Sequence, residues 1–156
     1  MRKIITAIAG FLVLCACNTI NCPLNNVVYV TFSMADTLKD SLTVWTILPD
    51  NTNDTLINRE VNVTSMKLPM SYGQEFDTWV FSAKDTLYKT TINDTIRISK
   101  DDQPHFESVD CGPVFFHTIT DASSTNHLIQ SVTINNSKVD YDASKTNIKI
   151  QYGSRD

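Results

Sequence analysis

The sequence contains three histidines and four cysteines, whose side chains could bind a metal or take part in catalysis. If residues 105–111 are extended, His105, Glu107 and Cys111 lie on one face, because alternate side chains of a strand point the same way. With His117 on a neighbouring strand, these groups could form an imidazole–carboxylate metal site. The sequence has no His-x-His or His-Glu-x-x-His spacing. We therefore expect structural histidines, no bound metal and no other cofactor.

Motifs for nucleophilic or phosphate chemistry are also missing from the sequence. It has no Gly-x-Ser-x-Gly, the turn that presents a hydrolase serine. Its four glycines do not form a phosphate-binding loop. The sequence therefore predicts a protein that is not an enzyme, with no evident small-molecule substrate.

The N-terminal segment carries the strongest pattern in the sequence. Basic residues 2–3 precede an apolar run over residues 4–14, which is typical of a secretory signal peptide and short for a permanent membrane span. Residues 14–17 read Leu-Cys-Ala-Cys, which resembles the bacterial lipobox. We expect residues 1–16 to be a signal helix that is removed, and Cys17 to carry diacylglycerol and an amide-linked chain such as palmitate. An ordinary secretory cleavage site and an uncleaved anchor helix are the alternatives.

Two cysteines remain once the lipoprotein signal has been processed. Cys15 leaves with the signal peptide and Cys17 is lipidated, so Cys22 and Cys111 form an even pair in an oxidising compartment. A disulfide is the simplest prediction for this pair. Two free thiols or a metal-binding pair are the alternatives.

The charge balance disfavours several classes of partner. Without the basic residues 2–3, the chain has 11 Lys and Arg against 17 Asp and Glu, a net charge of about −6. The basic residues are scattered, which argues against nucleic-acid binding. An acidic surface is not attracted to anionic headgroups, so the lipid anchor has to provide the contact with the membrane.

Short alternating apolar runs recur after Cys17, as expected for strands with one buried face. Clusters of Asn, Asp and Ser separate these runs at intervals of about ten residues. This rhythm predicts an all-β, antiparallel β-sandwich with immunoglobulin-like or related Greek-key connections over residues 27–156, after a lipidated tether at residues 17–26. A small barrel is the alternative. The runs include 28–32, 42–48, 56–63, 66–70, 79–81, 96–98, 115–119, 132–134 and 148–152, with Leu87 as a further strand position; turns are expected at 49–54, 71–75, 100–103, 121–126 and 135–144.

An Asp followed by Thr or Ser and an aliphatic residue occurs five times. Turn chemistry explains the pattern in part, because Asp accepts hydrogen bonds from backbone amides before a strand and Thr favours the strand itself. The pattern also resembles the acceptor motif for protein O-glycosylation in Bacteroidetes. The candidate acceptors are Thr37, Ser41, Thr55, Thr86 and Thr95.

Five aromatic residues could form a platform on which sugars stack. Trp45 and Trp79 lie within apolar runs, so we expect them to belong to the core. A carbohydrate-binding module would need several of the five side chains on one exposed face. The five are Trp45, Tyr72, Trp79, Tyr88 and Tyr141.

Two segments carry a resemblance to a known family: residues 17–26, with the pair Cys22-Pro23, and residues 104–119, with Asp110-Cys111-Gly112. Together they resemble an uncharacterised family of Bacteroidetes lipoproteins, the domain of unknown function 6452, over the whole mature chain. The resemblance implies an envelope location and a β-sandwich. It also suggests an envelope β-barrel protein as a partner.

The sequence therefore predicts a non-enzymatic lipoprotein of the cell envelope that supports or binds another protein. Acidic tracts after the lipidated cysteine resemble surface-export signals, and none follows Cys17. We expect the protein to face the periplasm from the outer membrane. The alternatives are a carbohydrate-binding accessory domain and a metal-dependent enzyme.

Overall fold

The structure is a computed structural model that describes residues 22, 27–48 and 50–153. The expected signal helix, Cys17 and most of the tether lie outside these residues. The described part of the chain contains ten strands and no α-helix. Within it, no helix has the length and apolar character needed to span a membrane.

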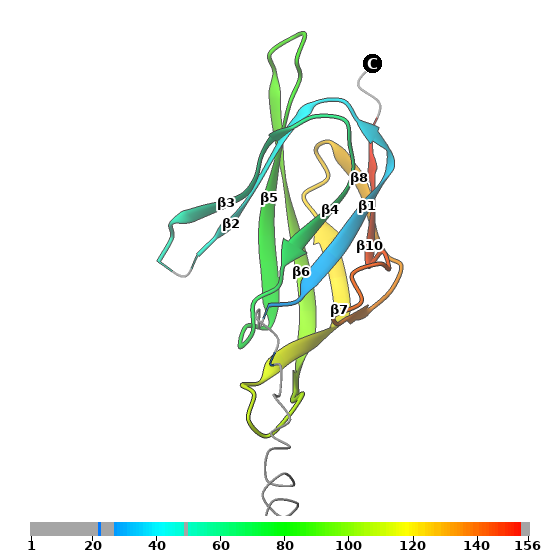
Figure 1. Ribbon diagram of the computed structural model, residues 1–156. Helices are drawn as coiled ribbons and strands as arrows, with labels where there is room; N and C mark the ends of the chain where they lie inside the picture. The colour runs from blue at the N-terminus through cyan, green and yellow to red at the C-terminus, as the bar shows by residue number, and fades with distance from the viewer. Residues whose placement is uncertain (1–21, 23–26, 49, 154–156) are drawn as a thin grey trace, which may run out of the picture.

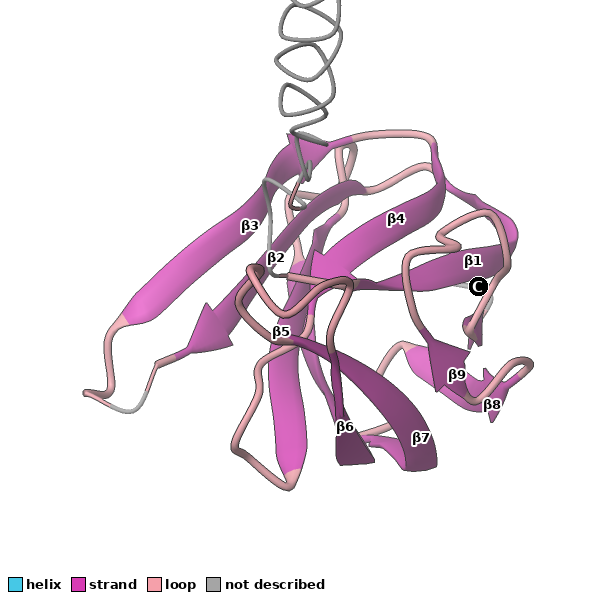
Figure 2. Cartoon of the chain, turned by 60° about the horizontal axis from the view of Figure 1, so that its bottom comes forward, coloured by secondary structure: helices cyan, strands magenta, loops and turns pink. Residues whose placement is uncertain are grey.

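The strands form two sheets that pack face to face (Figures 1 and 2), so the predicted all-β sandwich is confirmed. Strands change sheet between β1 and β2, between β3 and β4, between β4 and β5, and at each step from β7 to β10. The four-stranded sheet has the order β4 (Val63–Pro69), β1 (Tyr29–Leu38), β10 (Ile148–Tyr152), β8 (Ile129–Ile134). The six-stranded sheet has the order β3 (Asn53–Glu60), β2 (Ser41–Ile47), β5 (Phe76–Lys84), β6 (Thr91–His105), β7 (Val114–Ser124), β9 (Lys138–Val139).

The core lies between the sheets and follows from the alternation in the sequence. Trp79 and Phe81 of β5 point inward from one sheet, and Phe32 of β1 meets both rings edge-on at centroid distances of 5.8 and 5.9 Å. Ile148 and Ile150 are fully buried on β10. The intervening residues of these strands face outward, so each of them exposes one face and buries the other.

One pair of strands departs from the expected antiparallel sheet. The first and last strands, β1 and β10, pair in parallel, with Phe32 opposite Ile148. Asn147 fixes this junction, because its Oδ1 accepts the N–H of Thr31 at 2.9 Å and its Nδ2 donates to the carbonyl oxygen of Lys138 at 2.7 Å. One buried amide thus joins β10 to β1 and to the short strand β9.

Four local predictions are wrong. Residues 56–63 do not form one strand, because β3 ends at Glu60 and β4 begins at Val63 in the other sheet. Residues 100–103 form part of the long strand β6 rather than an exposed turn, because they pair with β7. Residues 121–124 likewise belong to β7 rather than to a turn. Leu87 lies in the turn between β5 and β6, where the Asp85 carboxylate accepts the N–H groups of Leu87 and Tyr88 at 2.6 and 2.9 Å and closes the turn.

The connections between strands place three projections around the sandwich. The β5–β6 hairpin extends from one end, and the β6–β7 connection lies at the opposite end (Figure 1). The β2–β3 hairpin extends away from the body of the six-stranded sheet (Figures 1 and 2).

Candidate functional site

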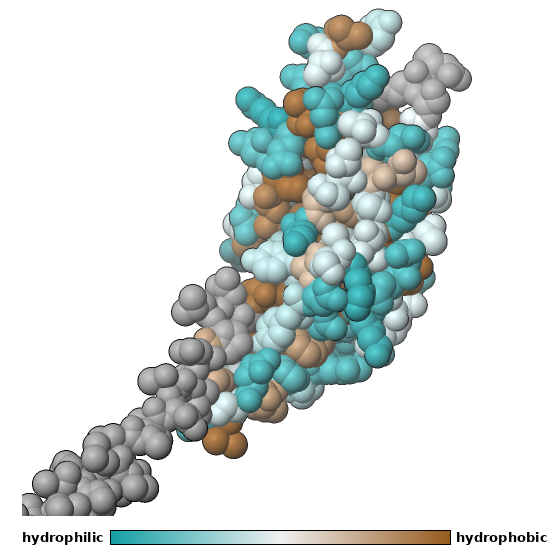
Figure 3. All heavy atoms as spheres, turned by 45° about the vertical axis from the view of Figure 1, so that its right-hand side comes forward, coloured by the Kyte–Doolittle hydropathy of each residue, from teal (hydrophilic) through white to brown (hydrophobic). Residues whose placement is uncertain are grey.

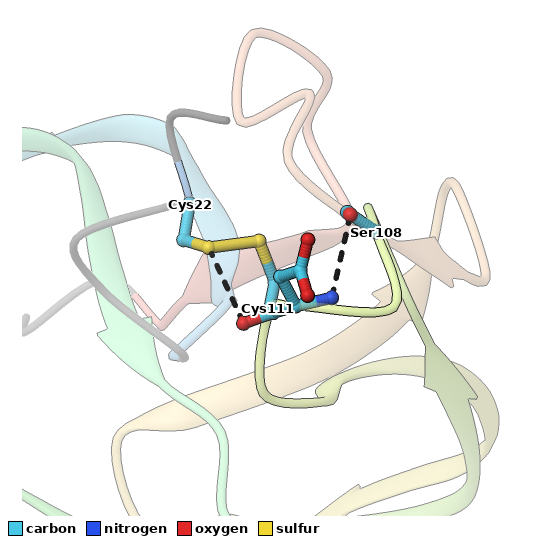
Figure 4. The surroundings of a disulfide bond; sticks show 4 residues. Cys22, Ser108 and Cys111 are labelled. Atoms are coloured by element: carbon cyan, nitrogen blue, oxygen red, sulfur yellow. Dashed lines mark hydrogen bonds between the residues drawn. A yellow bond between two sulfur atoms is a disulfide. The ribbon is translucent and has the colours of Figure 1, made fainter. Parts of the chain in front are cut away.

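A disulfide joins the segment before β1 to the β6–β7 connection. The Sγ atoms of Cys22 and Cys111 are 2.07 Å apart and their Cα atoms 5.5 Å apart, across 89 residues of sequence (Figure 4). Cys111 is buried, and its N–H donates to the carbonyl oxygen of Ser108 at 3.2 Å. The pairing expected from the sequence is thus present, and it holds the N-terminal segment against the end of the domain that carries the β6–β7 connection.

The five candidate acceptors of O-glycosylation lie in different settings. Thr37 at the end of β1, Thr55 in β3 and Thr86 in the β5–β6 turn are exposed. Ser41 at the start of β2 and Thr95 within β6 are half-buried. The first three hydroxyls are accessible to a modifying enzyme in the folded protein, whereas the last two are only partly so.

Asp94 does not have the strand-entry role that the sequence suggested. It is the fourth residue of β6 and is only 2 % exposed, because it continues the inward face of the strand. One carboxylate oxygen accepts the N–H groups of Leu128 and Ile129 at 2.7 and 2.8 Å. The other accepts the N–H of His127 at 2.8 Å and the hydroxyl of Thr125 at 2.7 Å.

These bonds order the connection from β7 to β8 and set the charge state of Asp94. Burial by itself would raise the pKa of the Asp94 carboxyl, but the hydrogen bonds from the amides of His127, Ile129 and Leu128 outweigh burial and hold this pKa below its usual value. Asp94 is therefore a structural anion. Its role is the type of local capping expected of Asp, directed to a loop distant in sequence rather than to the next residues.

The three histidines do not converge. The ring of His105 lies 3.1 Å from Glu107, that of His117 lies 2.7 Å from Asp102, and that of His127 lies 3.2 Å from Asp94. Each imidazole thus has a different carboxylate partner. Across residues 22, 27–48 and 50–153, no group of three or more His, Cys, Asp or Glu side chains could hold a metal ion.

A buried charge network lies in the second half of β6, around Lys100, where the sequence suggested a solvated turn. The Lys100 side chain is fully buried, and its Nζ lies 2.9 Å from Asp102 Oδ1 and 3.8 Å from Asp77 Oδ2. The same Nζ donates to the carbonyl oxygen of Gln74 at 2.8 Å. His117 on β7 completes the network through its contact with Asp102.

This network continues the inward face of β6. Asp94, Ile96, Ile98, Lys100 and Asp102 alternate along the strand and point toward the interior. The alternation with a period of two continues through the charged residues. This alternation is the sequence signal that indicates a strand here, and it is missed when the charged residues are interpreted as a solvated turn. A buried lysine requires a counter-charge, and Asp77 and Asp102 provide it.

The surroundings shift the pKa values of this network in opposite directions. Burial lowers the pKa of His117, against the opposing effect of Asp102, so the ring is neutral at pH 7. Burial would raise the pKa of Asp102, but hydrogen bonds from Lys100, Gly73 and His117 outweigh it and lower this pKa. Gly73 has a φ of +74°, a left-handed conformation that glycine adopts readily, and its N–H donates to Asp102 at 2.6 Å.

In contrast to Asp102, Asp77 is less readily ionised than an ordinary aspartate. Burial raises its pKa, and the opposing contributions of Ser71 and Lys100 are smaller. The N–H of Ser71 donates to the two carboxylate oxygens of Asp77 at 3.2 and 3.3 Å. Asp77 thus joins the network to the connection between β4 and β5, beside the outside of the sandwich.

The aromatic residues do not form one platform. Trp79 is in the core, whereas Tyr88 lies 80 % exposed on the β5–β6 turn at the far end of the molecule. Tyr72 stacks on Phe115 at 5.0 Å, and Tyr141 meets Phe116 edge-on at 5.0 Å. Since Phe115 and Phe116 are consecutive in β7, they point to opposite faces of the sheet. Tyr72 and Tyr141 therefore lie on different faces, and Trp45 is half-buried on β2.

The best candidate for a binding site is an apolar groove of about 380 Å³ beside the β2–β3 hairpin. Ile47 and Leu48, at the end of β2, are 50 % and 40 % exposed and form part of its wall. Asp77 also lines the groove, so the buried network lies directly behind it. A concave, largely apolar site with a few polar groups is the usual form of a ligand or partner site. The other apolar wall residues include Val27, Leu56, Met70, Tyr72, Phe76 and Trp79.

Comparison with known proteins places most of the chain in a protein family. The model of a family of unknown function, DUF6452, matches residues 41–152, which run from the start of β2 to the end of β10. The match includes Cys111 and the groove walls from β2 onward but not β1 or Cys22, so it is shorter than the resemblance over the whole mature chain that the sequence suggested. No curated protein and no solved structure matches the chain.

Proposed function

We propose that this chain, which belongs to the DUF6452 family of unknown function, is a lipid-anchored, non-enzymatic protein of the cell envelope that binds a partner protein through the groove beside the β2–β3 hairpin.

The disulfide is the observation that carries the anchor. Cys22 lies five residues after the lipobox cysteine, Cys17, and is bonded to Cys111 of the folded domain. A disulfide is typical of an oxidising compartment outside the cytoplasm, which the signal sequence independently predicts. The acyl chains on Cys17 would hold the domain at a membrane, since each buried CH₂ contributes about 0.8 kcal/mol.

The arrangement of reactive side chains favours a binding protein over an enzyme. His117, the most buried imidazole, contacts Asp102 inside a charge network that stabilises the sandwich. Cys22 and Cys111 are joined to each other and offer no thiol. A nucleophile next to a base, or several ligands around one point, would be needed for the catalytic alternatives.

The groove favours an apolar side chain from a partner protein. Ile47 and Leu48 line the groove and are exposed to solvent. Their burial against a partner would remove apolar surface from water, which is favourable. The volume of about 380 Å³ is at the lower end of the range for ligand pockets and suits one or two side chains of a partner. We propose an envelope protein, such as a β-barrel of the outer membrane, with this domain on the periplasmic side.

Metabolic labelling tests the anchor. Cells that express the full chain are grown with radiolabelled palmitate, and the protein is immunoprecipitated. The label is expected on the wild type and not on the Cys17→Ala variant, while both retain the Cys22–Cys111 disulfide. An unlabelled wild-type protein would contradict the lipoprotein proposal.

Site-specific photo-crosslinking tests the groove. A photo-reactive phenylalanine analogue replaces Ile47 in the lipidated protein, and a matched control places it at Lys149, an exposed position on β10 of the other sheet. Illumination of intact cells is expected to give one discrete crosslinked product at position 47 and none at position 149. Equal crosslinking at both positions, or none at 47, would contradict a partner in the groove.

A further inference from the structure

Two apolar side chains project from the end of the domain that carries the disulfide. Val109 is 98 % exposed and Phe106 is 61 % exposed, both in the β6–β7 connection. Apolar side chains are visible at this lower end of the molecule in the space-filling view (Figure 3). We call residues 106–110 the β6–β7 tip.

The β6–β7 tip is a built turn rather than a loose loop. The N–H of Cys111 donates to the carbonyl oxygen of Ser108, and the N–H of Asp110 lies 3.4 Å from the Ser108 hydroxyl (Figure 4). The disulfide fixes Cys111 on its other side. Val109 therefore remains exposed although the backbone around it is hydrogen-bonded and crosslinked.

The short chain between Cys17 and Cys22 limits how far the β6–β7 tip can lie from the proposed lipid anchor. Cys22 is five positions after Cys17, and five steps of extended chain span at most about 18 Å. The Cα atoms of Cys22 and Cys111 are a further 5.5 Å apart. If Cys17 carries the lipid, Cys111 lies within about 23 Å of the anchored residue. Val109 is two residues from Cys111, so the tip lies within reach of the bilayer interface.

From these distances we infer that the β6–β7 tip is a membrane contact, in which Val109 and Phe106 enter the interface between lipid headgroups and acyl chains. This inference rests on the proposed lipid anchor. Tyr72, stacked on Phe115, belongs to the same end of the domain, and tyrosine suits a site that is apolar on one side and wet on the other.

The charges near the tip specify the kind of lipid surface. Glu107 and Asp110 flank Val109, and the mature chain is acidic overall. Anionic headgroups would repel these carboxylates, so the contact depends on apolar side chains and suits zwitterionic lipid. The disulfide keeps the tip next to the anchor and so determines which end of the domain faces the membrane.

Tryptophan quenching in vesicles tests the inference with the full lipidated protein. Val109→Trp is reconstituted into phosphatidylcholine vesicles, with and without bromine on the acyl chains, where bromine quenches nearby indoles. The matched control is Leu87→Trp, on the opposite β5–β6 turn and 81 % exposed. Both positions are on exposed turns, so both variants are expected to keep the fold. Trp45 and Trp79 give the same background in each variant.

The expected result is a loss of emission in brominated vesicles for Val109→Trp beyond that of the parent, and no additional loss for Leu87→Trp. Flotation of the vesicles on a density gradient separates the two proposals. If the protein floats but Val109→Trp is quenched no more than Leu87→Trp, the tip is not in the membrane and the inference is wrong, while the anchor stands. If the protein does not float, the anchor and the inference both fail.

Discussion

The hydrogen bonds of Asp94 predict that its replacement by the isosteric Asn strongly destabilises the fold. Asp94→Asn preserves the shape of the side chain but replaces one acceptor oxygen with an NH₂ donor. In the native protein, each carboxylate oxygen accepts at least two hydrogen bonds from the β7–β8 connection. Whichever way the amide is turned, its NH₂ group therefore points at donors.

The magnitude follows from the partners that are lost. If the amide oxygen keeps the N–H groups of Leu128 and Ile129, then the N–H of His127 loses its acceptor and the hydroxyl of Thr125 has to rotate. A hydrogen bond to a charged group is worth about 1.5–3 kcal/mol, and the partly buried N–H of His127 adds a smaller cost. We expect Asp94→Asn to lower the free energy of unfolding by about 2–4 kcal/mol.

Urea unfolding of the detergent-solubilised protein measures this loss, with the emission of the buried Trp79 as the signal. The control is Asp101→Asn, an exposed carboxylate on the same strand, for which we expect a change within about 0.5 kcal/mol. Hydrogen exchange of the Leu128 and Ile129 amides should accelerate in Asp94→Asn. If the two variants unfold within about 0.5 kcal/mol of each other, the proposed role of Asp94 is wrong.

The pH dependence gives a second test of Asp94. Its pKa in the folded protein is below the usual value of 3.8, so its stabilising contribution is complete above pH 3.8 and is lost as the pH falls through the folded pKa. The difference in stability between wild type and Asp94→Asn should therefore be constant near neutral pH and shrink in acid. If the difference grows in acid, a group other than Asp94 determines the pH dependence of stability.

The remaining predictions concern the disulfide and the buried network, and each is measured by the same urea titration. Replacing both Cys22 and Cys111 with Ser should cost at most about 4–5 kcal/mol, the chain-entropy value for a closed loop of 89 residues, and wild type in reductant should match the variant. The pKa of His117 is lowered from 6.5, so its contribution is complete above pH 6.5 and declines as the pH falls below that value; His117→Gln should lack this decline. The pKa of Asp77 is raised from 3.8, so the wild type should lose stability as the pH rises from 3.8 through the folded pKa; Asp77→Asn should lack this loss.

Alternation in the sequence was sufficient for the fold class and for most strands. Val28, Val30 and Phe32 alternate and are buried, and Trp79 and Phe81 occupy the core as their apolar run indicated. Strand boundaries were less predictable where charged residues continue a strand. Residues 100–103 look like a turn by composition, yet they pair with β7 because the hairpin partner supplies hydrogen bonds that composition does not show.

The disulfide partners could be predicted from sequence because the expected signal processing and lipidation account for the other two cysteines, Cys15 and Cys17. The Lys100 network could not, because its members come from β5, β6 and β7 and a buried charge is recognised only by its partners. The groove beside the β2–β3 hairpin likewise joins residues of β2, β3, β4 and β5. Its walls are ordinary apolar positions until the sheets are assembled.

Local signals in the chain therefore predict its address, and they were sufficient for its class of fold and its cysteine pairing. A signal peptide, a period of two and a cysteine count are properties of neighbouring residues, and they can be recognised without knowing what lies across the sandwich. The role of Asp94, the charge pairs around Lys100 and the exposure of Val109 depend on contacts between distant segments. Those contacts exist only after the strands and their connections have assembled, which brings together residues whose separation in sequence carries no signal.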